Sequence, residues 1–179
     1  MNFSVRTIAL LAGGALGFGT AAVIFALRGA GKADAAGFLG HGSLLADLNL
    51  ALELLLVLGL TAGMLLARRG KIEGHRVNQT IWALVNVALV VAVMIPSLRN
   101  AKIGSLAELA HASAAVPWLH AALGLLTVVS AVWLVLQMND ILPERWHVSW
   151  WKTLMRFTLA GYWAVALLGA ALYYQWNIG

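Results

Sequence analysis

Long apolar runs separated by short polar connections dominate the pattern of this chain. Five of the runs have about the 20 residues that an α-helix needs to cross the hydrocarbon core of a bilayer. We therefore predict membrane-spanning helices at residues 7–28, 44–67, 78–98, 115–137 and 153–175. The connections are short and no repeat of fixed period is visible. The sequence thus predicts one all-α domain over residues 1–179, an integral membrane bundle of about five transmembrane helices.

The composition agrees with a membrane protein and changes how the charge is interpreted. Hydrophobic residues make up 61% of the chain and charged residues only 11%, against about 25% charged in soluble domains. The net charge of +5 therefore does not indicate nucleic-acid binding, because Lys and Arg of membrane proteins lie mostly in connections and set orientation. Eight basic residues fall on the side of the N-terminus and four on the other side: Arg6, Arg68, Arg69, Lys71, Arg76, Arg145, Lys152 and Arg156 against Arg28, Lys32, Arg99 and Lys102. We expect the N-terminus in the cytoplasm and the C-terminus outside.

The first apolar run resembles a signal peptide only superficially. Its apolar core, Thr7 to Leu27, is longer than the 7–15 residues typical of a signal peptide. We expect a retained helix, with cleavage as the alternative. Gly13, Gly17 and Ala21 recur every four residues, which predicts a smooth face against a neighbouring helix.

The second run carries two polar residues inside the membrane. Asn49 and Glu53 fall on one helix face. A carboxylate in hydrocarbon costs about 2.5–3.5 kcal/mol on insertion scales, so Glu53 should face the bundle interior or a cavity. It could relay protons, contact a quinone or pair with a cation. The alternative is a hydrogen-bonded Glu that only ties helices together.

The third run has a polar stripe on one face. His75, Gln79, Trp82 and Asn86 fall within about 60° of one another on an ideal helix. Lipid-exposed amides would have no hydrogen-bond partners, so the stripe should face other helices. It either holds a ligand or bonds helices to one another.

The five histidines divide between the two sides of the membrane. We predict His75 and His147 on the cytoplasmic side, and His41, His111 and His120 on the outer side, with His120 just after a helix-starting Pro117. Two histidines on different helices at one level are the minimum for bis-imidazole haem ligation, and they could equally bind copper or zinc.

We take haem b or copper as the candidate cofactor, with His75, His120, His147 and His111 as its candidate ligands; Glu53, Asn49, Gln79 and Asn86 would orient ligands or handle protons. Isolated interfacial histidines are the alternative. The chain has no Cys, which excludes thiolate metal sites and covalent haem attachment. No triad, P-loop or dinucleotide motif can be placed on a soluble segment, so any chemistry takes place at or in the bilayer.

From about residue 44 to 176 the chain resembles the family of small polytopic bacterial membrane proteins that includes the cytochrome oxidase maturation factor CtaM. The resemblance rests on Asn49 in "DLNLALELLLVLGL", on "ARRGKIEGHR", on "LHAALGLL", and on the basic-aromatic segment "HVSWWKTLMRFTLAGYWAVALLGAALYY". Pro96 and Ser97 are a departure, because they stand where many members have a His.

The resemblance implies a bacterial plasma (inner) membrane protein that assists assembly of a haem-copper oxidase near haem or copper delivery. It implies oxidase subunits or assembly factors as partners, besides the lipid bilayer, and it maps onto His75, His120 and His147. A b-type cytochrome or quinone-linked electron-transfer subunit is a second hypothesis. A non-catalytic accessory subunit is a third.

Overall fold

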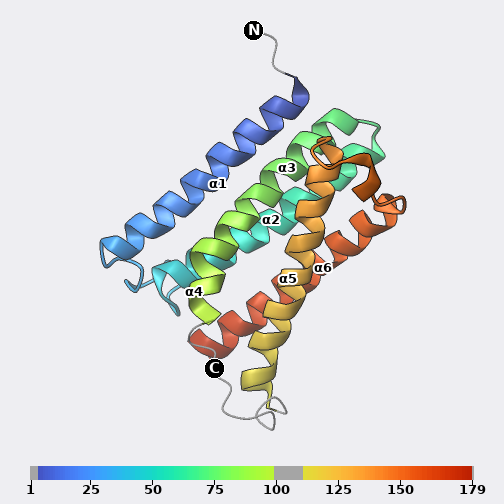
Figure 1. Ribbon diagram of the computed structural model, residues 1–179. Helices are drawn as coiled ribbons and strands as arrows, with labels where there is room; N and C mark the ends of the chain where they lie inside the picture. Colours follow the sequence, from blue (N-terminus) through green and yellow to red (C-terminus); the bar gives the residue numbers. More distant parts are fainter. Residues whose placement is uncertain (1–3, 99–110, 179) are drawn as a thin grey trace.

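The computed structural model describes residues 4–98 and 111–178 of the chain as an all-helical bundle (Figure 1). The described residues form no strand, only one isolated bridge between Ala36 and Ser43. The elements are α1 (Val5–Gly29), α2 (Leu44–Arg68), α3 (Ile72–Leu89), the π-helical segment η1 (Val90–Met94), α4 (Ile95–Leu98), α5 (Ala112–Met138), the 3-10 turn η3 (Glu144–Trp146) and α6 (Trp151–Asn177). The predicted fold class is confirmed.

Within residues 4–98 and 111–178, five helices are long and apolar enough to cross a membrane, so this is a multi-pass membrane protein. Large apolar side chains cover the outside of the bundle. Phe18 is 78% exposed, and Leu126 and Leu167 are each 67% exposed. Such side chains contact lipid when the helices span a bilayer.

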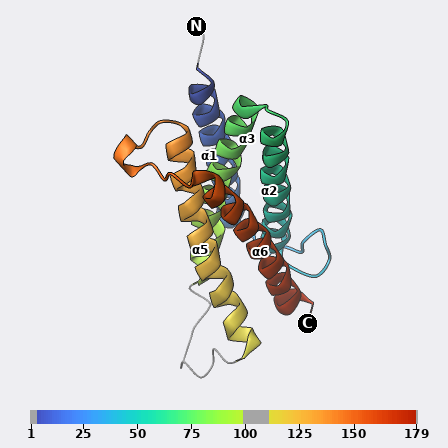
Figure 2. The ribbon, with the colours of Figure 1, turned by 90° about the vertical axis from the view of Figure 1, so that its right-hand side faces the viewer.

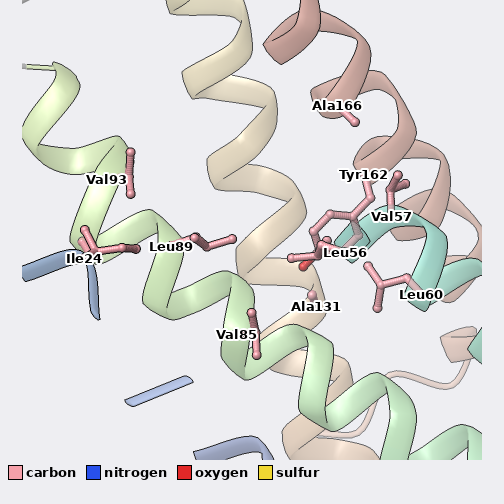
Figure 3. Close-up of a cluster of buried hydrophobic side chains, with 11 residues drawn as sticks. Ile24, Leu56, Val57, Leu60, Val85, Leu89, Val93, Ala131, Tyr162 and Ala166 are labelled. Carbon is pink, nitrogen blue, oxygen red and sulfur yellow. The ribbon is translucent and has the colours of Figure 1, made fainter. Parts of the chain in front are cut away.

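Helices α2, α3, α5 and α6 pack together, and α1 lies along the outer side of α3 (Figures 1 and 2). The core is a cluster of buried apolar side chains contributed by every long helix, with Tyr162 among them (Figure 3). We call the end with the N-terminus the N-terminal end; it also carries the connections 69–71 and 139–150. The C-terminal end carries the loop 30–43 and the end of α6 (Figure 1).

The small residues of α1 face α3, as the four-residue spacing predicts. A Cβ at Gly13 would lie 2.8 Å from Leu84 Cδ1, and one at Gly17 would lie 2.9 Å from the backbone oxygen of Leu84. These two glycines let the α1 and α3 backbones approach closely. The resulting van der Waals contact stabilises the helix pair, because lipid provides no hydrophobic driving force for helix association.

Four of the predicted helices agree with the structure to within three residues at each end, but the third begins at Ile72, not at 78. Gly70, at φ +74°, turns the chain after α2, and Glu73 in the first turn of α3 suits the positive end of the helix dipole. The polar residues 72–77, which the apolar pattern assigns to a connection, are helical. His75 therefore lies on α3.

The prediction that Pro117 starts the fourth helix is wrong. Helix α5 begins at Ala112 with His111 as its N-cap, so Pro117 lies inside the helix. Because proline has no N–H, the backbone oxygen four residues before it lacks its α-helical donor. Arg99 and Lys102, which contribute to the predicted orientation, lie outside the described residues.

The C-terminal end of the third membrane span departs from α-helical geometry at η1. Pro96 has no N–H, so it cannot donate to the carbonyl of Ala92, its α-helical partner. The chain adopts the π-helical segment there, and Nη1 of Arg28 at the end of α1 donates to the Ala92 oxygen instead. A side chain of α1 thus satisfies a carbonyl that a proline leaves free.

We predict that Arg28→Met destabilises the protein by about 1–3 kcal/mol, the usual cost of leaving a buried acceptor unpaired. The double variant Arg28→Met with Pro96→Ala should recover part of this loss, because the substituted alanine would supply an N–H to the Ala92 oxygen. Thermal unfolding in detergent measures both. Arg6→Met, at an exposed position of the same helix, is the control, and a double variant no more stable than Arg28→Met would contradict the explanation.

Candidate functional site

The polar stripe of α3 faces α2, so the prediction that it faces other helices is confirmed. Nδ1 of His75 lies 2.8 Å from the Gly63 oxygen, Nδ2 of Asn78 donates to the Gly59 oxygen at 2.8 Å, and Nε2 of Gln79 donates to the Leu60 oxygen at 2.9 Å. The three side chains lie in the first two turns of α3, and their acceptors lie within five residues of α2, from Gly59 to Gly63. We call this set of bonds the α2–α3 ladder. It joins the helices through backbone oxygens.

The indole of Trp82 continues the contact where α2 has a glycine. A Cβ at Gly59 would overlap the Trp82 ring. Glycine thus gives the indole a flat backbone surface, and the ring fixes how closely α3 approaches α2. A bulky aromatic against a glycine is a shape match that a shift of one turn would destroy.

We predict that Gly59→Ala destabilises the protein by about 1–3 kcal/mol, the typical cost of overpacking, because the indole cannot move without displacing α3. Gly14→Ala on α1, where an added Cβ meets no atom within 4 Å, should be neutral or slightly stabilising. The midpoint of thermal unfolding in detergent compares the two. Equal unfolding midpoints for Gly59→Ala and Gly14→Ala would contradict this prediction, because the Trp82 ring would then be able to move away from the added Cβ.

Asn86, the last residue of the stripe, contacts α6 and not α2. Its Nδ2 donates to the Tyr162 hydroxyl of α6 at 2.9 Å, and both side chains are buried. The α3 stripe is therefore shared between α2 and α6. Every member now has a partner or a packing surface, and this favours the interpretation in which the stripe bonds helices together.

Glu53 of α2 is buried against α6. It is 6% exposed, and its Oε1 has no hydrogen-bond partner among the described residues. A Cβ at Gly169 of α6 would overlap the Glu53 carboxyl group. The carboxyl group thus occupies space that exists because residue 169 is a glycine. Burying a carboxyl without partners is costly, which makes Glu53 a candidate for chemistry.

His120 of α5 approaches the same helix from another side. Its imidazole contacts the backbone of Val165 in α6, while its Nδ1 is buried without a hydrogen-bond partner among the described residues. A neutral imidazole carries a lone pair on one ring nitrogen and a proton on the other. It can therefore accept a proton or bind a metal inside the membrane.

Glu53 and His120 thus contact α6 at Gly169 and Val165, positions one turn apart that lie on the same face of that helix. We call these two side chains the α6 pair. A carboxyl and an imidazole, each with an unpartnered buried atom, come from two helices to one turn of a third. Where a carboxyl and an imidazole reach each other, they can share a proton or bind a cation.

The other histidines lie apart from this pair. His75 is buried within the α2–α3 ladder. His147 lies in the exposed connection before α6, where its Nε2 bonds to the Leu142 oxygen. His111 is exposed at the start of α5, about 13 Å along that helix from His120. His41 is exposed in the loop before α2.

Two tests show how these residues fit the candidate cofactors. His75 and His147 each bond to a backbone carbonyl through one ring nitrogen, which leaves the other nitrogen of each ring for a ligand, whereas His111 and His120 lie about 13 Å apart along one helix. The described residues form no group of three or more metal-ligating side chains. A single ion could find two ligands in the α6 pair, whose unpartnered atoms suit a cation.

Asn49, Gln79 and Asn86 differ in what they contact. Gln79 and Asn86 bond to α2 and α6 as described, whereas Oδ1 of Asn49 is buried with no partner among the described residues. None of the three contacts the α6 pair through a described hydrogen bond.

Asp47 is a structural residue that the sequence analysis did not single out. It is fully buried at the C-terminal end of the bundle, where it accepts from the Tyr173 hydroxyl and from the Leu39 N–H. A Cβ at Gly37 would overlap its carboxylate. The loop 33–43 is folded over this carboxylate. Its sequence signal is the glycine-rich loop just before an acidic residue, whereas Tyr173 is 126 residues away.

We predict that Asp47→Ala frees the loop 33–43, because Leu39 and Tyr173 each lose their acceptor. The variant should be about 1–3 kcal/mol less stable, and a protease added to the detergent-solubilised protein should cleave it within the loop. Asp34→Ala, at an exposed position of the same loop, is the matched control. Protease resistance equal to that of the control would contradict the role of Asp47.

No protein-family model, no curated protein and no solved structure matches the chain. The fold and the contacts above therefore carry the functional argument, together with the family resemblance of the sequence.

Proposed function

We propose that this protein assists the maturation of a respiratory haem-copper oxidase and that it handles copper as cargo at the α6 pair. The observation that carries the proposal is the convergence of Glu53 and His120, each with an unpartnered buried atom, on one turn of α6. Ionisable residues inside membrane spans are rare and usually functional.

The resemblance to small bacterial oxidase-maturation proteins supports the biological setting. It places the protein in a bacterial plasma (inner) membrane, with oxidase subunits or assembly factors as partners. The excess of basic residues at the N-terminal end supports a cytoplasmic N-terminus and an outer C-terminus. Glu53 then lies in the outer half of the membrane, about 13 Å along α2 from its first residue.

Copper suits the described residues better than haem b. Imidazole is a common copper ligand, and a carboxyl can complete a weak site. Nδ1 of His120 and the Glu53 carboxyl group would hold the ion, which supplies one-electron chemistry to the enzyme that receives it. Two protein ligands hold a metal less tightly than a closed set of four. Weak binding of the copper ion allows its transfer to an acceptor protein.

Copper binding to the purified full chain tests the proposal. We expect the detergent-solubilised protein to compete for Cu(I) with a coloured chelator. His120→Ala and Glu53→Gln should each weaken binding at least tenfold, because each removes one of two ligands. His147→Ala removes an exposed imidazole and should leave the affinity unchanged. Thermal unfolding of each variant checks that it is folded.

A second measurement links binding to maturation. Membranes from cells that carry His120→Ala in place of the native chain should lose haem-copper oxidase activity, and added copper should restore part of it. Copper affinity that is the same in all variants would exclude the α6 pair. Sharp reduced-minus-oxidised visible bands that vanish in His75→Ala would instead identify a b-type cytochrome.

The α2–α3 ladder favours a second candidate function. Its three side chains bond to backbone oxygens of α2, as in a membrane subunit whose polar residues only pack helices. A colourless protein without metal by elemental analysis, in cells whose oxidase activity is independent of it, would point to this non-catalytic accessory role.

A further inference from the structure

A groove opens between α1 and α2 in the half of the bundle nearer the C-terminal end. It has a volume of about 360 Å³. Both helices pack on the third span, whose Leu89 and Val93 form the floor. The walls are almost wholly apolar, with Gly19 of α1 and Leu48 of α2 facing across the groove. In a membrane such a groove is open to the acyl chains of lipids.

One polar atom in the groove wall lacks a partner. Of the two polar side chains there, Thr20 donates to the Leu16 oxygen within its own helix. Oδ1 of Asn49 is buried and has no hydrogen-bond partner among the described residues. An amide oxygen without a donor costs free energy in hydrocarbon.

A cation lies at the end of the groove. Arg28 follows the groove residue Ile24 by one turn of α1, and its Nη1 bonds to the oxygen of Ala92, next to the floor residue Val93. A guanidinium has five N–H donors, and the described residues provide an acceptor for one of them. The groove therefore has an apolar body, an amide and a positively charged end near the membrane surface.

We propose that this groove binds one anionic phospholipid, such as phosphatidylglycerol. One acyl chain lies between α1 and α2 on Leu89 and Val93. Arg28 binds the phosphate, since guanidinium groups form strong charge-assisted hydrogen bonds with phosphate. The site is separate from the α6 pair and does not depend on the proposed copper function.

Native mass spectrometry of the detergent-solubilised full chain tests this binding with lipids of matched acyl chains. We expect phosphatidylglycerol to bind at least tenfold more tightly than phosphatidylcholine, which has no net charge. Phosphatidylmethanol keeps the negative charge but lacks the headgroup hydroxyls, so it should bind as tightly as phosphatidylglycerol if the charge sets the preference.

Gly19→Leu is the decisive variant. A Cβ at Gly19 meets no atom within 4 Å, so the leucine enters the groove without disturbing the helices, and phosphatidylglycerol affinity should fall at least tenfold. Gly14→Leu, at an equally open position of α1 outside the groove, should bind the lipid like the native chain. Both variants should keep native copper affinity, so a failure here is distinct from a failure of the copper proposal.

One further variant tests the charge. Arg28→Gln should remove the preference for phosphatidylglycerol over phosphatidylcholine. Native-like lipid affinity in Gly19→Leu, or equal binding of the charged and neutral lipids by the native chain, would overturn the proposal.

Discussion

The structure depends on one constraint: a polar atom that enters hydrocarbon must find its partner within the protein. The α2–α3 ladder meets this constraint by directing side chains of α3 to backbone oxygens of α2. The same helix then reaches α6 through Asn86 and Tyr162. Because these bonds fix how α3 lies on both neighbours, they also fix where Glu53 and the floor of the lipid groove lie within the bundle.

The exceptions to this constraint are informative because they are few. Among the described residues, the unpartnered buried atoms belong to Asn49, Glu53, Arg76, His120, Trp133 and Asn139, whereas most other polar side chains of the bundle are bonded to backbone. Such atoms raise the free energy of the protein alone and lower it when a ligand supplies the missing partner. Function in a protein of this kind is therefore best sought where the hydrogen bonding is incomplete.

Local patterns predicted much of the fold. Apolar run length located the five spans, and the spacing of Gly13 and Gly17 predicted the close contact of α1. Helical periodicity also predicted that the α3 stripe faces inward. Which helix each polar residue meets depends on packing between distant segments, so Asp47 with Tyr173 and the α6 pair were not predicted. The early start of α3 was missed because its first turns are polar, although His75 is buried there.

The α2–α3 ladder and the Trp82–Gly59 contact have a mechanical consequence. Two smooth apolar helices can slide along each other when the bilayer thickens or thins. Helices α2 and α3 are instead held in one register by hydrogen bonds to individual carbonyl groups and by the contact of Trp82 with Gly59. The pair must respond to hydrophobic mismatch by tilting as a unit or by deforming the surrounding lipid. The depth of Glu53 relative to α3 is therefore set by these contacts, and α1 follows α3 because Arg28 bonds to the Ala92 carbonyl.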